Sequence, residues 1–186
     1  MKRSLMMVAV TFSVLAGGCA SDAASRQGYS RLYEQGLATH AGDTGVPAEA
    51  LQRFMALYSP LNADYIQAHL DQVYAPRLYF NDTLVTLYDR QALRKHLLDT
   101  AKRLDSMSLD VQRSWHEGED VFVQWIMEAR FSILGSQRQS RTIGISQLRF
   151  NKQGQVVFHQ DFWDSSQGLD QQIPIVGAVP RWLRNH

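Results

Sequence analysis

The segment over residues 156–164 carries the side chains of this chain that are best suited to acid–base chemistry. It follows residues 151–154, which are typical of a turn, and it opens with two valines, so the sequence predicts a strand there. Successive side chains of a strand point to opposite faces, which places His159, Asp161 and Trp163 on one face. An imidazole, a carboxylate and an indole on one strand face are what a lined, half-polar pocket requires.

A second carboxylate, Asp82, ends a strand that is predicted over residues 78–82. In a mostly apolar pocket, burial and a neighbouring acid would raise the pKa of Asp82 or Asp161, and a protonated His159 would lower it. Such shifts suit general acid–base catalysis near neutral pH. Both carboxylates and the imidazole are therefore candidate catalytic groups.

A structural role is the alternative for the same residues. An aspartate at the end of a strand commonly accepts hydrogen bonds from its own loop, as Asp82 could do. His159 and Asp161 can bond each other and shape a binding pocket without any turnover, because perturbed acids also occur in structural networks. The sequence leaves both interpretations open.

The strand predicted over residues 121–134 decides which further side chains face the pocket. Its odd-numbered positions are apolar from 121 to 131, so this set is expected to face the core, with Glu128 outside. A register shifted by one residue would bring Glu128 into the pocket, and the sequence leaves that open. The residues predicted to line the pocket as ligand contacts are Ser146, Trp125, Met127, Trp163 and Phe80.

Other chemistries are not indicated. His159 and Asp161 offer two ligands on one face, whereas a protein metal site needs three or more, so neither a metal nor a cofactor is expected. There is no Gly-x-Ser-x-Gly elbow and no phosphate-binding loop. The net charge is +1, and Lys and Arg do not cluster beyond the first three residues, which argues against nucleic-acid binding.

Residues 1–18 have the features of a signal peptide: two basic residues, then an apolar run that is short for a membrane span. Residues 15–19 resemble a bacterial lipobox, which implies cleavage before Cys19 and its lipidation. Ala20 then implies sorting to the outer membrane, with the protein facing the periplasm. Because Cys19 is the single cysteine, no intrachain disulfide can form. The alternative is an ordinary secretory signal and a periplasmic protein with a free thiol.

The remaining chain predicts a tether followed by one domain. Residues 19–46 are polar and rich in small residues, which favours a flexible tether with room for a short helix around residues 30–37. The domain is expected over residues 47–186, with a final short helix over 165–172. Helices segregated from antiparallel strands indicate an α+β fold. The predicted helices cover residues 47–58, 63–73 and 89–104, and the predicted strands cover 78–82, 107–115, 121–134, 138–150 and 156–163.

This order of elements resembles the SnoaL-like branch of the nuclear transport factor two-like superfamily over residues 48–183. Residues 79–82 are similar to the family's Phe-x-Asp-Pro strand end, and residues 89–93 to its Gly-Arg-x-x-Leu helix start. The resemblance implies a curved antiparallel sheet wrapped on N-terminal helices, forming a cone with a pocket. The superfamily includes isomerases, dehydratases, epoxide hydrolases, polyketide cyclases and non-enzymatic binders, so the resemblance implies no single activity.

Two relatives suggest roles for the candidate residues. Tyr58 and Asp82 are similar in position to the oxyanion donor and the proton-moving acid of ketosteroid isomerases, with Ser146 in place of a second acid. Asp161 matches a strand carboxylate of limonene-type epoxide hydrolases. The other two members of that hydrolase set belong at two positions of the strand over residues 121–134. These positions carry Trp125 and Met127, or Ile126 and Glu128 in the shifted register, so the arginine of the set is missing from them in either register.

The leading expectation is a membrane-anchored domain that binds a small hydrophobic molecule in its cone. The first alternative is a cofactor-free isomerase, dehydratase or cyclase that uses Asp82 or Asp161 as general base, with Tyr58 and Ser146 as donors. The second alternative is a protein-interaction module, because relatives of this fold often form homodimers through the outer face of the sheet. A collapsed cone would favour this second alternative, and an open cavity would favour binding or catalysis.

Overall fold

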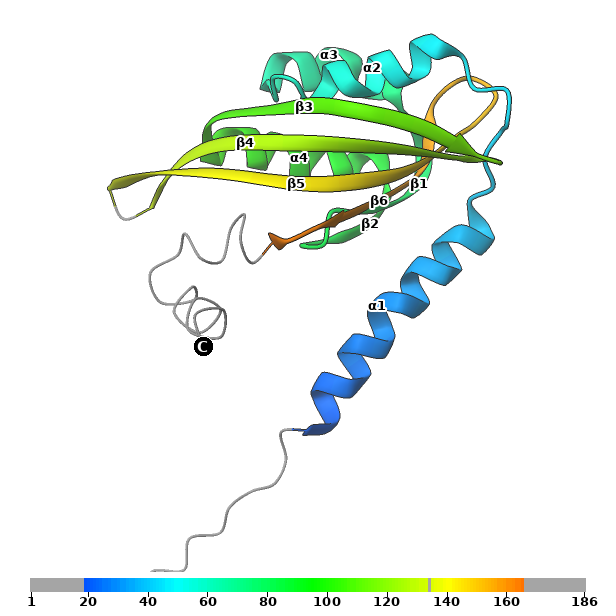
Figure 1. The fold of residues 1–186 in the computed structure, drawn as a ribbon, viewed down its shortest axis with the longest axis horizontal. Helices are drawn as coiled ribbons and strands as arrows, with labels where there is room; N and C mark the ends of the chain where they lie inside the picture. Colours follow the sequence, from blue (N-terminus) through cyan, green and yellow to red (C-terminus); the bar gives the residue numbers. More distant parts are fainter. Residues whose placement is uncertain (1–18, 134, 166–186) are drawn as a thin grey trace, which may run out of the picture. The chain divides into compact units, whose positions relative to one another are not determined.

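The computed structural model describes residues 19–133 and 135–165 (Figure 1). The predicted signal peptide, the final short helix and the C-terminal tail lie outside the described residues, apart from the start of that helix at Ser165. The chain divides into two compact units, Met1–Gln35 and Gly36–His186. Except for the first helix, every helix and strand described below belongs to the second unit.

The first helix, α1, runs over Cys19–Thr39 and is longer than the short helix predicted around residues 30–37. Alanine, leucine, arginine and glutamine recur along it, and these residues have high helix propensity, which the spacing of apolar residues does not reveal. No helix among the described residues combines the length and the apolar content needed to cross a membrane.

Three helices of the second unit begin and end close to the predicted positions: α2 (Ala48–Tyr58), α3 (Ala63–Val73) and α4 (Arg90–Arg103). The Asn62 side chain caps α3 by accepting hydrogen bonds from two backbone amides, and Asp89 caps α4 by accepting from the amide of Ala92. Each helix has one apolar side, which contributes residues such as Leu57, Ile66 and Leu93 to the core.

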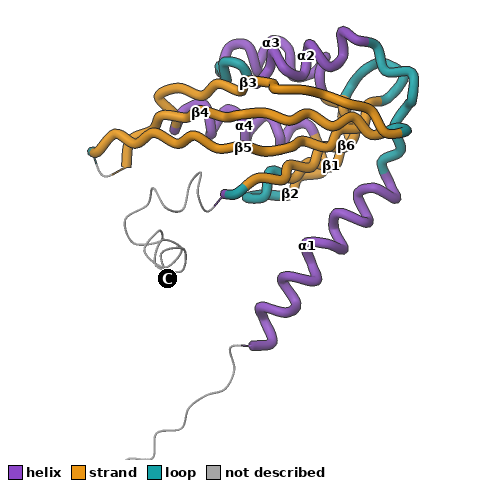
Figure 2. The backbone as a smooth tube through the Cα atoms, in the orientation of Figure 1, coloured by secondary structure: helices purple, strands orange, loops and turns teal. Residues whose placement is uncertain are grey.

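The strands form one curved, open sheet, as Figure 2 shows. In chain order they are β1 (Tyr74–Asn81), β2 (Thr86–Asp89), β3 (Leu104–Glu117), β4 (Asp120–Ile133), β5 (Ser136–Phe150) and β6 (Val156–Trp163). Their order in the sheet is β2-β1-β6-β5-β4-β3. The strand β2 is not among the predicted strands, because four residues are too few to show an alternating pattern.

The sheet is mixed, so the prediction of an antiparallel sheet is wrong at one pairing. β3 to β6 follow one another as antiparallel neighbours, but β6 then lies parallel to β1, with Phe80 opposite His159. This pairing joins strands from the two ends of the domain, and no local sequence signal specifies it. The α+β cone is otherwise confirmed, with α2, α3 and α4 packed on one side of the sheet (Figures 1 and 2).

Candidate functional site

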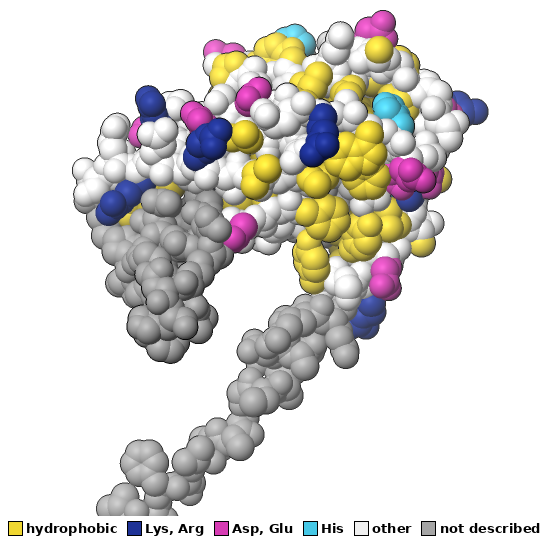
Figure 3. Space-filling view, in the orientation of Figure 1, with side chains coloured by type: hydrophobic (Ala, Val, Ile, Leu, Met, Phe, Trp, Pro, Cys, Tyr) yellow, Lys and Arg dark blue, Asp and Glu magenta, His cyan; other side chains and the backbone are white. Residues whose placement is uncertain are grey.

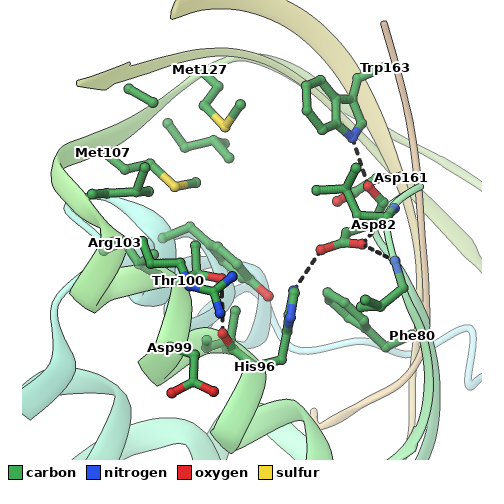
Figure 4. A pocket seen from close by; sticks show the side chains of 18 of the residues that line it. Phe80, Asp82, His96, Asp99, Thr100, Arg103, Met107, Met127, Asp161 and Trp163 are labelled. Carbon is green, nitrogen blue, oxygen red and sulfur yellow. Dashed lines mark hydrogen bonds and ion pairs between the residues drawn. The ribbon is translucent and has the colours of Figure 1, made fainter. Parts of the chain in front are cut away.

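The helices and the sheet surround a cavity of about 940 Å³ with mainly apolar walls. Its lining comes from α2, α4 and every strand of the sheet, so that residues distant in sequence meet there. Figure 4 shows Phe80, Met127 and Trp163 facing into it together with Asp82 and Asp161. All nine residues predicted for the site line this cavity: Tyr58, Phe80, Asp82, Trp125, Met127, Ser146, His159, Asp161 and Trp163.

The register of β4 follows the predicted parity. Val123, Trp125 and Ala129 are buried on the inner side, while Glu128 is exposed and forms a 3.1 Å ion pair with Arg141 of β5. The alternative register, with Glu128 in the pocket, is therefore wrong. The alternation of apolar and polar residues predicted the register of β4 correctly, because one face of the strand is buried and the other is not.

His159 stands at the centre of a chain of hydrogen bonds. Its Nε2 lies 2.7 Å from Oδ1 of Asp161, and its Nδ1 lies 2.6 Å from the hydroxyl of Tyr74. The Tyr74 hydroxyl in turn lies 2.7 Å from that of Tyr58. A pair of buried tyrosines is thus connected through the imidazole to a carboxylate at the cavity wall.

Asp161 has a second line of support from the sheet. The Ser146 hydroxyl donates to Oδ1 of Asp161 at 2.5 Å, and the indole N–H of Trp125 donates to the Ser146 oxygen at 2.9 Å. Ser146 and Asp161 are paired across β5 and β6, which brings the two side chains together on the inner face. Ser146 therefore holds the carboxylate in this structure instead of offering its proton to the cavity.

Asp82 forms the second imidazole–carboxylate pair of the cavity. Its Oδ2 lies 2.7 Å from Nε2 of His96 on α4, and its Oδ1 accepts from the amides of Leu84 and Val85. The local bonding expected of a strand-end aspartate is present, and a cavity-lining imidazole is added to it. The Trp163 indole donates to the Asp82 carbonyl at 2.8 Å, so β6 also holds this turn.

The environment shifts the pKa values of three of these groups. Burial raises the pKa of Tyr58 far above its usual value; the bond to Tyr74 opposes this, and the charges of Asp161 and Asp82 add to it. Burial and the neighbouring Tyr58 likewise raise the pKa of Tyr74. Burial alone would raise the pKa of the Asp82 carboxyl, but the hydrogen bonds from His96 and the two amides outweigh it, so the net pKa is lowered. Of the opposing influences expected on the Asp82 pKa, those that lower it prevail, because its bonds favour the anion more than burial disfavours it.

Three cavity or network residues were missed by sequence reasoning. Tyr74 lies at the junction of α3 and β1, where nothing local marks its role. His96 lies on α4 between the buried Leu93 and Leu97, and the available signal for it was a titratable residue among apolar ones at helical spacing. Ser140 is buried at the cavity wall, and its hydroxyl has no hydrogen-bond partner among the residues that the structure describes. Within residues 28–133 and 135–165, no group of three or more His, Cys, Asp or Glu is arranged to hold a metal ion.

The fold and its cavity define a class: a cone-shaped α+β domain with a pocket of small-molecule size. The model of the SnoaL-like domain family matches residues 51–159, which is more than half of the chain. The chain therefore belongs to the SnoaL-like family, within the nuclear transport factor two-like superfamily. No curated protein matches it.

Solved structures support the same fold. A protein from Shewanella denitrificans assigned as a SnoaL-like polyketide cyclase superimposes with a TM-score of 0.58 at 12% identity, covering 67% of this chain and 94% of that one. TsrD from Streptomyces laurentii gives 0.55 at 22% identity, covering 73% and 98%. A protein of ketosteroid isomerase-like fold from Catenulispora acidiphila, solved in complex with trimethylamine, gives 0.55 at 13%, covering 68% and 93%. At these identities the likeness establishes the fold alone.

Proposed function

We propose that this domain binds a small hydrophobic molecule in the cavity between its helices and its sheet. The observation that carries the proposal is a space of about 940 Å³ that is open and apolar, where a packed protein core would be filled by side chains. Pockets for small organic ligands have volumes of roughly 300–1,000 Å³ and a few fixed polar groups, as here. An open cone also favours binding or catalysis over the pure interaction module.

Uptake of an apolar fluorescent probe tests this proposal. Ala129 lies on the inner face of β4 at the cavity wall, so Ala129→Phe should fill part of the space and weaken probe binding about tenfold or more. Ile126→Phe is the matched control, since Ile126 points to the opposite face of the same strand. Absence of saturable uptake by the unaltered protein would contradict the proposal.

Cofactor-free acid–base catalysis is the second candidate function. The observation that favours it is that two imidazole–carboxylate pairs, His159–Asp161 and His96–Asp82, both border one apolar cavity. In an isomerisation, dehydration or cyclisation, Asp161 or Asp82 would take a proton from a carbon atom of the substrate. The imidazole bonded to that aspartate would orient the carboxylate. Tyr58 and Ser146, the donors expected from ketosteroid isomerases, are bonded to Tyr74 and Asp161 in this structure.

Isomerisation of a β,γ-unsaturated ketone, followed by the ultraviolet absorbance of the conjugated product, tests the catalytic candidate. Asp161→Asn and Asp82→Asn should each lower turnover by at least about a hundredfold without unfolding the domain. Glu128→Gln, which removes an equal charge outside the cavity, should leave turnover unchanged. Turnover that survives both aspartate changes would rule out these bases.

A lipid anchor at Cys19 is the proposed attachment, at the bacterial outer membrane and facing the periplasm. Its support is the signal-peptide pattern of residues 1–18 and the following cysteine. Dual or triple acylation would make such an attachment stable. Mass spectrometry of the mature protein should show acyl chains that Cys19→Ala removes, with the variant shifting from the membrane to the soluble fraction or remaining unprocessed.

A homodimer through the outer face of the sheet is the proposed assembly. Ile143 of β5 and Phe162 of β6 lie on that face and are 56% and 41% exposed. Figure 3 shows hydrophobic side chains gathered on the face of the molecule that Figure 1 presents. Analytical ultracentrifugation of the protein and of Ile143→Lys should show a dimer and a monomer, respectively.

A further inference from the structure

The polar end of the cavity has a definite sign of charge, which follows from its hydrogen bonds. The buried Tyr58 hydroxyl needs an acceptor, and the Tyr74 oxygen provides it at 2.7 Å. In the arrangement that gives every group of the chain a partner, Tyr74 donates its own proton to Nδ1 of His159, and Nε2–H donates to Asp161.

In this arrangement the hydrogen-bond donors to the Asp161 carboxylate are uncharged. His159 and Ser146 both donate to Oδ1, and among the described residues nothing is bonded to Oδ2. The carboxylate is 15% exposed and lines the cavity. One carboxylate oxygen therefore faces the apolar space with its negative charge uncompensated by a neighbouring cation.

A second carboxylate lies at this end of the cavity. Asp82 has a lowered pKa and is ionised at neutral pH, and His96 lies beside it and contributes to the lowering. Lys95 and Arg103 of α4 also border the cavity: Lys95 is paired with Asp99 at 2.6 Å, and Arg103 lies across the cavity from Asp161 and Trp163 (Figure 4). Among the described residues, neither of these two cations is paired with Asp161.

Aromatic rings surround the same acidic end. Phe80 and Phe54 pack on the His159 ring at centroid distances of 4.9 and 5.4 Å, and Trp163 lies beside Asp161 in Figure 4. The Trp125 indole reaches Asp161 through Ser146. The faces of aromatic rings attract cations, most strongly where water is excluded.

We infer that the cavity selects hydrophobic molecules that carry a positive charge, such as a protonated amine, with the charged end at Asp161 and the apolar body in the cone. This inference rests on the proposed binding of a small hydrophobic molecule. An ammonium group donates hydrogen bonds to Oδ2 and neutralises a half-buried charge. A carboxylate at the same place faces repulsion, and an alcohol supplies a weaker, uncharged hydrogen bond.

Competition among three matched ligands tests the inference. Decylamine, decanol and decanoate share one alkyl chain and differ in the charge of the head group at neutral pH. Each displaces a neutral naphthalene-based fluorescent probe from the purified protein. The amine should bind at least about tenfold more tightly than the alcohol, and the carboxylate should bind more weakly than the alcohol.

Two variants locate the preference within the protein. Asp161→Asn should reduce the amine-to-alcohol ratio to within about threefold of unity, while Glu128→Gln, outside the cavity, should keep the wild-type ratio. If Asp161→Asn does not fold, Asp82→Asn takes its place and should reduce the ratio in part.

The outcomes separate this inference from the function on which it rests. If the neutral probe does not bind at all, the proposed function fails and the inference fails with it. If the probe binds but the amine binds no better than the alcohol, hydrophobic binding holds and charge selection is overturned. An unchanged preference in both aspartate variants would also overturn it.

Discussion

Nε2 of His159 and Oδ1 of Asp161 are joined by a 2.7 Å hydrogen bond between residues two positions apart on β6. The strand geometry alone puts both side chains on one face, and Tyr74 then fixes the ring through its other nitrogen at 2.6 Å. The same imidazole thus connects the interior of the domain, where the tyrosines are buried, to the wall of the cavity. Changes to this chain of bonds should alter the free energy of unfolding and the preference for ligands.

Removing the Tyr74 hydroxyl should destabilise the domain. Tyr74→Phe leaves the Tyr58 hydroxyl and Nδ1 of His159 without their partner in a buried place, which costs about 1–3 kcal/mol of unfolding free energy. Urea unfolding measures this cost. Tyr88→Phe, on a residue that is 53% exposed, should leave the free energy of unfolding unchanged. A free energy of unfolding of Tyr74→Phe equal to that of the wild type would contradict the role of this hydroxyl as a buried hydrogen-bond partner.

The Asp82 carboxyl should make stability depend on pH in the acid range. Its pKa in the folded protein is below the usual 3.8, so the folded state favours the anion more than the unfolded state does. This contribution is complete at pH values above 3.8 and is lost as the pH falls through the folded pKa. Denaturant unfolding at a series of acid pH values should therefore show a steeper loss for the wild type than for Asp82→Asn. Parallel curves for the two proteins would show that Asp82 does not carry the effect.

Gly144 of β5 is required by the Trp125 indole opposite it. A Cβ at position 144 would overlap the indole ring, which contacts the glycine across the β4–β5 pair. Gly144→Ala should displace the ring, break its bond to Ser146 and destabilise the domain by about 1–3 kcal/mol. A shift in tryptophan fluorescence with a lower melting temperature checks this. Ile143→Ala, on the adjacent outward position, should leave the fluorescence in place.

Arg149 holds the segment that enters the domain. It is 8% exposed, pairs with Asp120 at 2.7 Å and Glu119 at 3.0 Å, and donates to the carbonyl of Leu37 at 2.8 Å. Arg149→Met leaves two carboxylates without their cation and should cost about 3–5 kcal/mol. Hydrogen exchange should become faster at residues 36–42, whereas the exposed Arg141→Met should have little effect. If hydrogen exchange at residues 36–42 is the same in Arg149→Met as in the wild type, Arg149 does not anchor this segment.

The sequence by itself determined the helices α2, α3 and α4, the strands β3 to β6 and the side chains that face the cavity. Those features depend on short-range chemistry: Asp89 caps the helix that follows it, and the alternating residues of β4 place Trp125 inside and Glu128 outside. The nine predicted site residues line one cavity because strand parity and helix spacing already fix which way each side chain points.

The tertiary structure alone decided which of these side chains are bonded to which. Tyr74 is bonded to His159, which is 85 positions away in sequence, and His96 of α4 is bonded to Asp82, which follows β1. The parallel pairing of β1 with β6 brings the first of these contacts about, and no turn or periodicity encodes it. Partners of this kind, and the shift of the Asp82 pKa that one of them causes, depend on distances between distant segments, which exist only once the chain has folded.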